Sequence, residues 1–124
     1  AFSFLNISVF NLNTFQFIKH DILPIDIFIN HHCFISKSEN EEKYQMLLFC
    51  FSSGLSIKYD ENNNTFRFHP LPICKDITLF KHYAYVCVNN VIFFFGGWND
   101  RYTDVVISKS VYKYSIRENK WTTF

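Results

Sequence analysis

The segment Val91-Ile92-Phe93-Phe94-Phe95-Gly96-Gly97-Trp98 decides our interpretation of this chain, because an unbroken apolar run stops there at a glycine pair. Five apolar residues without alternation are typical of a strand covered on both faces, and their valine, isoleucine and phenylalanine content favours a strand over a short core helix. The glycines allow a positive φ or the close approach of another side chain. We therefore predict a buried strand that ends in a special backbone conformation.

A predicted hairpin follows this strand toward the end of the sequence. Residues 111–116 are strand-like and residues 117–120 are turn-like. Asn119 in this turn tolerates a left-handed φ, and an extended strand resumes at Trp121. Tyr114 stands seven positions before Trp121, so the order is apolar strand, glycine pair, loop, tyrosine, turn and tryptophan.

A degenerate repeat of this order of strand, glycine, tyrosine and aromatic residue lies earlier in the sequence. The apolar run at residues 47–51 leads to Ser53 and Gly54, which we align with Gly96 and Gly97. The first glycine of the pair has therefore been replaced in the earlier copy.

The aromatic spacing is repeated as well. Tyr59 and Phe66 are seven positions apart, and Asn64 lies where the later copy has Asn119. Phe66 replaces the tryptophan and keeps an aromatic side chain at that place. We expect these aromatic residues to be buried between neighbouring sheets, where each contributes roughly 1.5–3 kcal/mol.

Two further pairs of similar segments are separated by about fifty positions. Candidate first strands open on His32 and His82, fifty positions apart, and residues 13–17 match residues 64–68 at an offset of fifty-one. Repeats with a period of roughly 20–50 residues are typical of solenoids and propellers.

This pattern resembles the kelch repeat, in which four apolar residues, a glycine pair, a tyrosine and a tryptophan follow one another. The resemblance covers Val91 to Trp121 and implies an all-β fold of four-stranded antiparallel blades, as in galactose oxidase and kelch-type β-propellers. Such rings close with about four to eight blades of roughly 50 residues each, so 124 residues supply about two and a half. We therefore expect a partial propeller that is a piece of a longer protein.

The repeat also predicts where the blades begin and end. We expect residues 1–19 to be strands three and four of a preceding blade, with Phe10 in the place of the tyrosine. Residues 26–70 form a first whole but degenerate blade in this interpretation, and residues 76–124 form a second. The structural motif residues are Gly54, Tyr59, Phe66, Gly96, Gly97, Tyr114 and Trp121.

Composition and charge argue against several classes of function. The chain is 48% hydrophobic and has a formal net charge of +1 without a basic stripe, so we expect no nucleic-acid partner. Its apolar runs are far shorter than the ~20 residues that span a bilayer, and residues 1–10 lack the basic leader of a signal peptide. We expect no membrane association and a cytoplasmic location.

The cysteines and histidines match no recognised metal or catalytic pattern. Cys33, Cys50, Cys74 and Cys87 contain no C-x-x-C pair, which favours buried free thiols, although Cys33 and Cys87 fall on equivalent first strands where a disulfide or zinc pairing stays open. Adjacent residues on a strand face opposite ways, so His31 and His32 would not share an ion, whereas His31 and Cys33 could. With no nucleophile elbow or phosphate loop, we expect no catalytic residue, no metal and no cofactor.

Kelch propellers mostly serve as protein-interaction platforms, often as substrate receptors of ubiquitin ligases and in some proteins as actin binders, while a minority are enzymes. The resemblance therefore implies a non-enzymatic protein-binding module that needs further blades or self-association. The alternative is a piece of a galactose-oxidase-like or sugar-processing enzyme, and a third is a degenerate fragment whose exposed apolar side leads to aggregation.

The resemblance also implies which residues meet the partner, since kelch binding faces are built from loops between strands two and three and between blades. The long loop after the glycine pair contains tryptophan, arginine and tyrosine, which dominate binding hot spots. The candidates are Trp98, Asn99, Asp100, Arg101 and Tyr102 in this loop, and His20, Asp21, Lys75 and Asp76 in the crossovers.

Overall fold

The protein is described by a computed structural model for residues 6–24, 33–40, 43–50, 53–99 and 105–124. Antiparallel strands dominate these ranges, and a single 3-10 turn, η1 (Ile77–Leu79), joins two of the sheets. Within the same ranges, no helix has the length and apolar character needed to cross a membrane.

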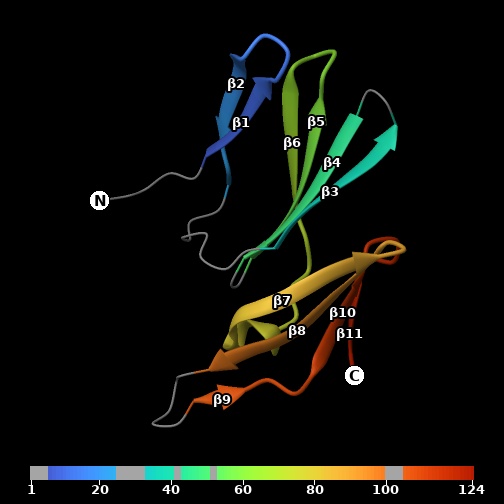
Figure 1. Ribbon diagram of the computed structural model, residues 1–124. Coiled ribbons are helices and arrows are strands. Elements are labelled where there is room, and N and C mark those ends of the chain that lie inside the picture. The colour runs from blue at the N-terminus through green and yellow to red at the C-terminus, as the bar shows by residue number, and fades with distance from the viewer. Residues whose placement is uncertain (1–5, 25–32, 41–42, 51–52, 100–104) are drawn as a thin grey trace.

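The strands form three sheets that follow one another along the chain (Figure 1). The N-terminal hairpin contains β1 (Asn6–Asn11) and β2 (Gln16–Ile22). The central sheet has the order β3 (Cys33–Asn40), β4 (Lys43–Cys50), β5 (Ser53–Asp60) and β6 (Thr65–Pro70). The C-terminal sheet has the path β7 (Lys81–Val88), β8 (Val91–Asn99), β10 (Val111–Ser115) and β11 (Lys120–Thr123), with β9 (Val106–Ile107) paired to β8. The predicted all-β fold, a partial β-propeller of antiparallel sheets, is confirmed.

Three hairpins share one turn geometry. In each, an aromatic residue pairs with another seven positions later: Phe10 with Phe17, Tyr59 with Phe66, and Tyr114 with Trp121. The ring centroids of these pairs are 5.7, 5.0 and 5.2 Å apart, respectively. The residue five positions after the first aromatic has a left-handed φ, at Phe15 (55°), Asn64 (52°) and Asn119 (53°).

The predicted asparagine turns are therefore confirmed, and each is tied to its tyrosine. The Tyr59 hydroxyl donates to Asn64 Oδ1 at 2.7 Å, and the Tyr114 hydroxyl donates to Asn119 Oδ1. The β7–β8 turn has left-handed φ values of 50° at Asn89 and 63° at Asn90, as expected for a two-residue hairpin.

The offset predicted for the first hairpin is wrong. Its turn aligns Phe10 with Tyr59 and Phe15 with Asn64, which is an offset of 49 and not 51. The similarity of residues 13–17 to residues 64–68 is therefore not structural. Phe15, unlike Asn64, has a bulky side chain in a left-handed conformation that favours glycine or asparagine.

The alignment of the glycines is also wrong. Tyr59 pairs with Tyr44 on strand β4, as Tyr114 pairs with Ile92 on strand β8, so Gly96 is equivalent to Leu48. Gly54 lies in β5 and pairs back to Phe49. The two glycines therefore occupy different places in their sheets.

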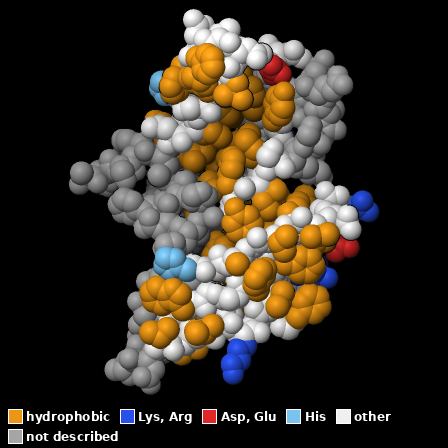
Figure 2. All heavy atoms as spheres, in the orientation of Figure 1, with side chains coloured by type: hydrophobic (Ala, Val, Ile, Leu, Met, Phe, Trp, Pro, Cys, Tyr) orange, Lys and Arg blue, Asp and Glu red, His pale blue; other side chains and the backbone are white. Residues whose placement is uncertain are grey.

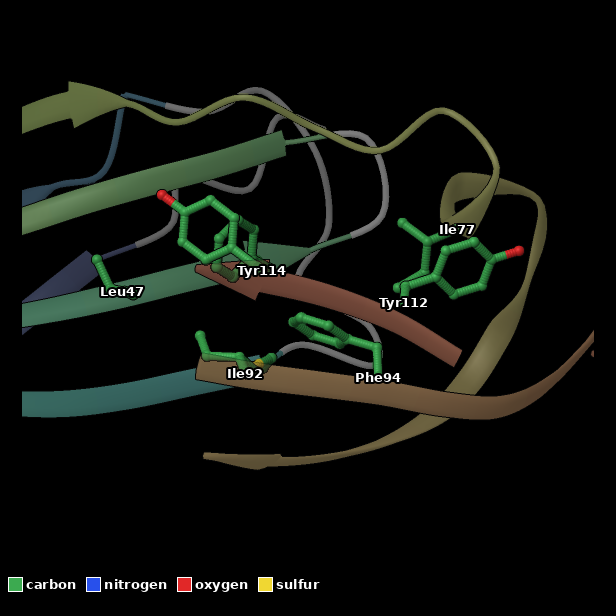
Figure 3. Close-up of a cluster of buried hydrophobic side chains, with 8 residues drawn as sticks. Leu47, Ile77, Ile92, Phe94, Tyr112 and Tyr114 are labelled. Atoms are coloured by element: carbon green, nitrogen blue, oxygen red, sulfur yellow. The ribbon is translucent and has the colours of Figure 1, made fainter. Parts of the chain in front are cut away.

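The central sheet is apolar on both faces, because successive side chains of a strand point in opposite directions. Leu47 and Phe49 of β4 are buried against the C-terminal sheet, together with Ile77, Ile92, Phe94, Tyr112 and Tyr114 (Figure 3). Leu48, Leu55 and Ile57 are buried on the other face, where they pack with Leu23, which follows the N-terminal hairpin.

Phe49 is the central side chain of the contact between the two larger sheets. Its ring lies edge-on to Phe94, Tyr114 and Trp121, with centroids 5.8, 5.0 and 5.4 Å away. We call these four residues the aromatic cluster. Trp121 Nε1 also donates to the carbonyl of Pro72 at 2.7 Å, which ties β11 to the crossover that follows the central sheet.

Replacing Phe49 by alanine is expected to reduce the free energy of unfolding by about 3–5 kcal/mol, because it removes a buried ring that three others enclose. The matched control is Phe95→Ala, since Phe95 is 42% exposed and Phe49 only 3%. Chemical denaturation of both variants measures the difference. Equal losses would contradict the central position of Phe49.

Replacing Phe15 by asparagine is expected to stabilise the chain by about 1 kcal/mol, because asparagine tolerates the left-handed φ and would copy Asn64 and Asn119. The control is Leu12→Asn, which removes a side chain of nearly equal exposure, 78% against 77%, from the same hairpin. Thermal unfolding compares the two variants, and a gain for Leu12→Asn alone would refute the turn argument.

Candidate functional site

The residues predicted to bind a partner lie in several separate places. His20 and Asp21 are in strand β2, where they pair with Ser8 and Ile7, so their predicted position in a crossover is wrong. Physically, β2 continues to Ile22 because β1 offers it a full length of paired backbone.

Two other candidates do lie in a crossover, and three cannot be placed. Lys75 and Asp76 are exposed in the segment before η1, and Asp76 is its N-cap residue without a side-chain capping hydrogen bond. Asp100, Arg101 and Tyr102 lie outside the described residues.

Trp98 and Asn99 belong to strand β8 and not to a loop, which corrects the predicted end of this strand at Phe95. The reason is β9, which pairs Ile107 with Trp98 and Val106 with Asn99. On the other edge of β8, Lys81 of β7 pairs with Trp98. Trp98 is therefore held in a strand that is paired on both edges.

The backbone next to Trp98 is left-handed at three residues. Gly96 and Gly97 have φ values of 72° and 81°, and His82 on the paired strand has 56°. A Cβ at Gly96 would meet nothing within 4 Å, so its backbone conformation and not lack of space requires glycine there. Gly54 is the opposite case, since its Cβ would lie 3.0 Å from Phe49 Cε1 and 3.1 Å from a carbon of both Leu71 and Ile73. The predicted special backbone after the apolar run is confirmed for Gly96 and Gly97.

The His82 and Trp98 rings lie together beside these left-handed residues. Their centroids are 5.4 Å apart and their planes differ by 9°, so they are stacked. His82 is exposed and Trp98 half-buried, and Ile107 pairs with Trp98 in the same sheet. Sequence reasoning missed His82, although histidine is one of the residues enriched at left-handed φ.

The segment that pairs with the end of β8 carries exposed aliphatic side chains. Val105, Val106 and Ile107 are 65%, 49% and 68% exposed. Ile107 pairs with Trp98 and lies on the same face of the sheet, whereas Val106 faces the opposite way. We call His82, Trp98 and Ile107 the β8 rim. Stacked rings beside a branched aliphatic side chain can bind an apolar or aromatic group by burial and ring contact. Tryptophan is one of the residues that contribute most binding energy at protein interfaces. Figure 2 shows hydrophobic side chains at the surface of both the upper and the lower sheets.

The structural motif residues of the repeat lie between or within the sheets. Tyr59 and Tyr114 are buried, and Phe66 and Trp121 are half-buried. Phe66 packs against the buried cluster below the N-terminal hairpin, and Trp121 packs in the aromatic cluster. These rings are therefore occupied by packing and form no open platform.

The cysteines are free thiols, and two of them are strongly shielded. Burial, followed by the nearby Cys87, raises the pKa of Cys33 to about 12, and burial also raises the pKa of Cys50. Both thiols therefore stay protonated at neutral pH and are poor nucleophiles and metal ligands. Cys87 is exposed and Cys74 half-buried, so the expectation of buried thiols holds for only two of the four. In the described part of the chain, no three histidine, cysteine or acidic side chains come together as a metal site.

Comparison with known families gives one match. A family model for the Kelch motif matches residues 80–124, the segment that contains β7 to β11 and the aromatic residues Phe94, Tyr114 and Trp121. No curated protein sequence matches the chain.

Replacing Gly96 by alanine is expected to reduce the free energy of unfolding by about 1–2 kcal/mol through the left-handed φ alone, and Gly96→Asn should recover part of this loss. At Gly54, where space is limiting, alanine is expected to cost about 1–3 kcal/mol through overpacking, and asparagine more than alanine.

Denaturant unfolding of the four variants measures these free energies. The opposite order of alanine and asparagine at the two positions is the expected result. The same order at both positions would show that one cause, space or backbone, governs both glycines.

Proposed function

We propose, from the premise that the C-terminal sheet is a kelch repeat within a partial β-propeller, that this chain is a protein-interaction module that binds a protein partner through the β8 rim. The kelch motif indicates an interaction scaffold in general terms. The rim as the point of contact is our own inference.

The observation that carries this proposal is the position of Trp98. Both tryptophans are half-buried, but Trp121 packs in the aromatic cluster between two sheets, whereas Trp98 lies at the end of β8 against an exposed histidine ring. The register makes Cys50 the equivalent of Trp98 in the central sheet, and Cys50 is 1% exposed. A large aromatic ring at this surface is therefore not part of the repeated packing.

The backbone around Trp98 supports a binding function for the rim, because strand pairing fixes this backbone before a partner arrives. Trp98 is paired to β7 on one edge and to β9 on the other, and Ser108 N donates to the carbonyl of Gly97 at 3.0 Å. A backbone held in this way loses little conformational freedom on binding, which favours affinity.

The partner in this proposal is a protein and not a nucleic acid or a membrane. A net charge of +1 offers little attraction to phosphates, whereas an apolar rim with two stacked rings fits a protein hot spot. A ubiquitin-ligase substrate or a cytoskeletal protein is the expected kind of partner. The cytoplasm is the expected compartment, and four free thiols agree with a reducing environment.

Replacing Trp98 by alanine is expected to lower the recovery of a specific partner in affinity capture by about tenfold or more, because tryptophan truncation at a hot spot typically costs about 2 kcal/mol or more. Phe95→Ala is the matched control, since Phe95 lies on the same strand and is 42% exposed. Quantitative mass spectrometry of the captured proteins gives the readout.

Equal recovery with the two variants would contradict the rim as the binding site. His82→Ala should give an intermediate loss, since it removes one ring of the stack and leaves Trp98 in place. Metal analysis of the purified full-length protein addresses the alternative of a propeller enzyme. Stoichiometric copper would overturn the proposed function.

A further inference from the structure

Strand β8 changes its partner strand at the glycine pair. It pairs with β10 as far as Phe95 and with β9 from Trp98 onward. Gly96 and Gly97 therefore separate the main part of the strand from its last two residues. Beyond the glycines lies a short three-stranded unit, which we call the tip. It consists of Lys81 of β7, Trp98 and Asn99 of β8, and β9. We call the rest of the C-terminal sheet the sheet body.

The backbone leaves the extended conformation at one level across both β7 and β8. The register pairs Tyr83 with Gly96 on one side of this level and Lys81 with Trp98 on the other, so His82 stands opposite Gly97. All three residues at this level, His82, Gly96 and Gly97, have a left-handed φ. Because a left-handed residue is not extended, the two strands change direction together between the sheet body and the tip.

The tip has little part in the buried packing of the sheets. The sheet body contributes Ile92, Phe94, Tyr112 and Tyr114 to the buried cluster shared with the central sheet. Among the residues that the structure describes, neither buried cluster contains a tip residue, and half-buried Trp98 does not pack against them. Strand β9 also lies at the lower end of the molecule, away from the central sheet (Figure 1). Segments with few buried apolar contacts change conformation at a low cost in free energy.

The surroundings of Gly96 leave its backbone room to move. A Cβ at Gly96 would meet nothing within 4 Å, so neighbouring atoms do not restrain this position from outside. Glycine has access to more combinations of φ and ψ than any other residue. Hinges in proteins are a few residues at the ends of elements that absorb a change in φ and ψ.

We propose that His82, Gly96 and Gly97 form a hinge about which the tip turns as one unit relative to the sheet body. Strand pairing within the tip keeps Trp98 and Ile107 together, while the hinge changes the direction in which they face. The functional consequence rests on the proposed function of the β8 rim. The hinge lets an internally fixed set of side chains adjust to the surface of a protein partner.

The distance between two nitroxide labels, measured by double electron–electron resonance, reports this motion. The full chain is used without a partner. One label is placed at Val106→Cys in the tip, where the side chain is 49% exposed and faces away from the rim. The other is placed at Lys120→Cys, an exposed position of β11. The more accessible native thiols, Cys74 and Cys87, are replaced by alanine to prevent labelling.

A second pair of labels within the sheet body is the control. It combines Lys120→Cys with Val86→Cys in β7, where Val86 is 46% exposed, close to the exposure of Val106. The distance distribution of the tip pair is expected to be about twofold broader than that of the control pair, because only the tip pair spans the hinge.

Substitutions at the hinge test its cause from both strands. Gly96→Asn is expected to narrow the tip distribution to the width of the control pair, because asparagine tolerates a left-handed φ but has less conformational freedom than glycine. His82→Gly should broaden the tip distribution, whereas His82→Asn, which also removes the ring, should not. Asn90→Gly is the matched control, since Asn90 has a left-handed φ of 63° in the β7–β8 turn outside the hinge, and it should leave the width unchanged. The His82 variants test the hinge even if Gly96→Asn fails to fold.

Equal widths for the tip pair and the control pair would overturn the hinge. A tip distribution that broadens as much with Asn90→Gly as with His82→Gly would overturn it as well. Because no partner is present, the result is separate from the proposed function. A narrow tip distribution together with selective loss of capture on Trp98→Ala removes the hinge and keeps the rim. A broad distribution that Gly96→Asn narrows, together with equal capture by Trp98→Ala and Phe95→Ala, keeps the hinge and removes the rim as the binding site.

Discussion

The contact of Phe49 with the other three rings of the aromatic cluster is the interaction on which the rest of the structure depends. A four-stranded sheet satisfies its backbone hydrogen bonds locally but cannot bury an apolar face by itself. Phe49 comes from the central sheet, and Phe94, Tyr114 and Trp121 come from the C-terminal sheet. The edge-on contacts of Phe49 with these rings add about 0.5–1.5 kcal/mol per pair to the burial of apolar area, so the contact between the two sheets contributes to stability beyond the pairing within each sheet.

The same constraint explains why both ends of the array leave apolar side chains exposed. Phe95, Val86 and Val88 of the C-terminal sheet are 42%, 46% and 50% exposed, and Phe17 of the hairpin is 67% exposed. Residues of the neighbouring sheet cover much of each buried face, as Cys33 and Leu47 do for Ile92, and residues of the connecting segments, such as Ile77 and Leu23, complete the cover. Exposed faces at the two ends are therefore the direct consequence of a packing rule in which every sheet needs two neighbours.

Sequence spacing predicted the hairpins because a tyrosine, an asparagine turn and a second aromatic residue are all local to about eight positions. The prediction failed for the glycines, because two different physical causes can require glycine at a position. Gly96 is required for its φ of 72°, while Gly54 is required for space beside Phe49, and the printed sequence cannot distinguish the two. The sequence analysis also placed Trp98 in a loop, because it did not predict the short strand β9, which pairs with the end of β8. The stacking of His82 on Trp98 was not predicted, because the sequence analysis interpreted this histidine as the repeated first residue of a strand.

The backbone around Trp98 and the N-terminal hairpin differ in how they are held in place. Trp98 lies in backbone that is paired on both edges, and the cluster that contains Phe94 of the same strand supports it. Among the described residues, the two strands of the N-terminal hairpin pair only with each other, and the hairpin is anchored through Lys19 and a few apolar contacts. The aromatic cluster fixes the C-terminal sheet through its contact with the central sheet, so the backbone around Trp98 does not depend on the contacts of the N-terminal hairpin.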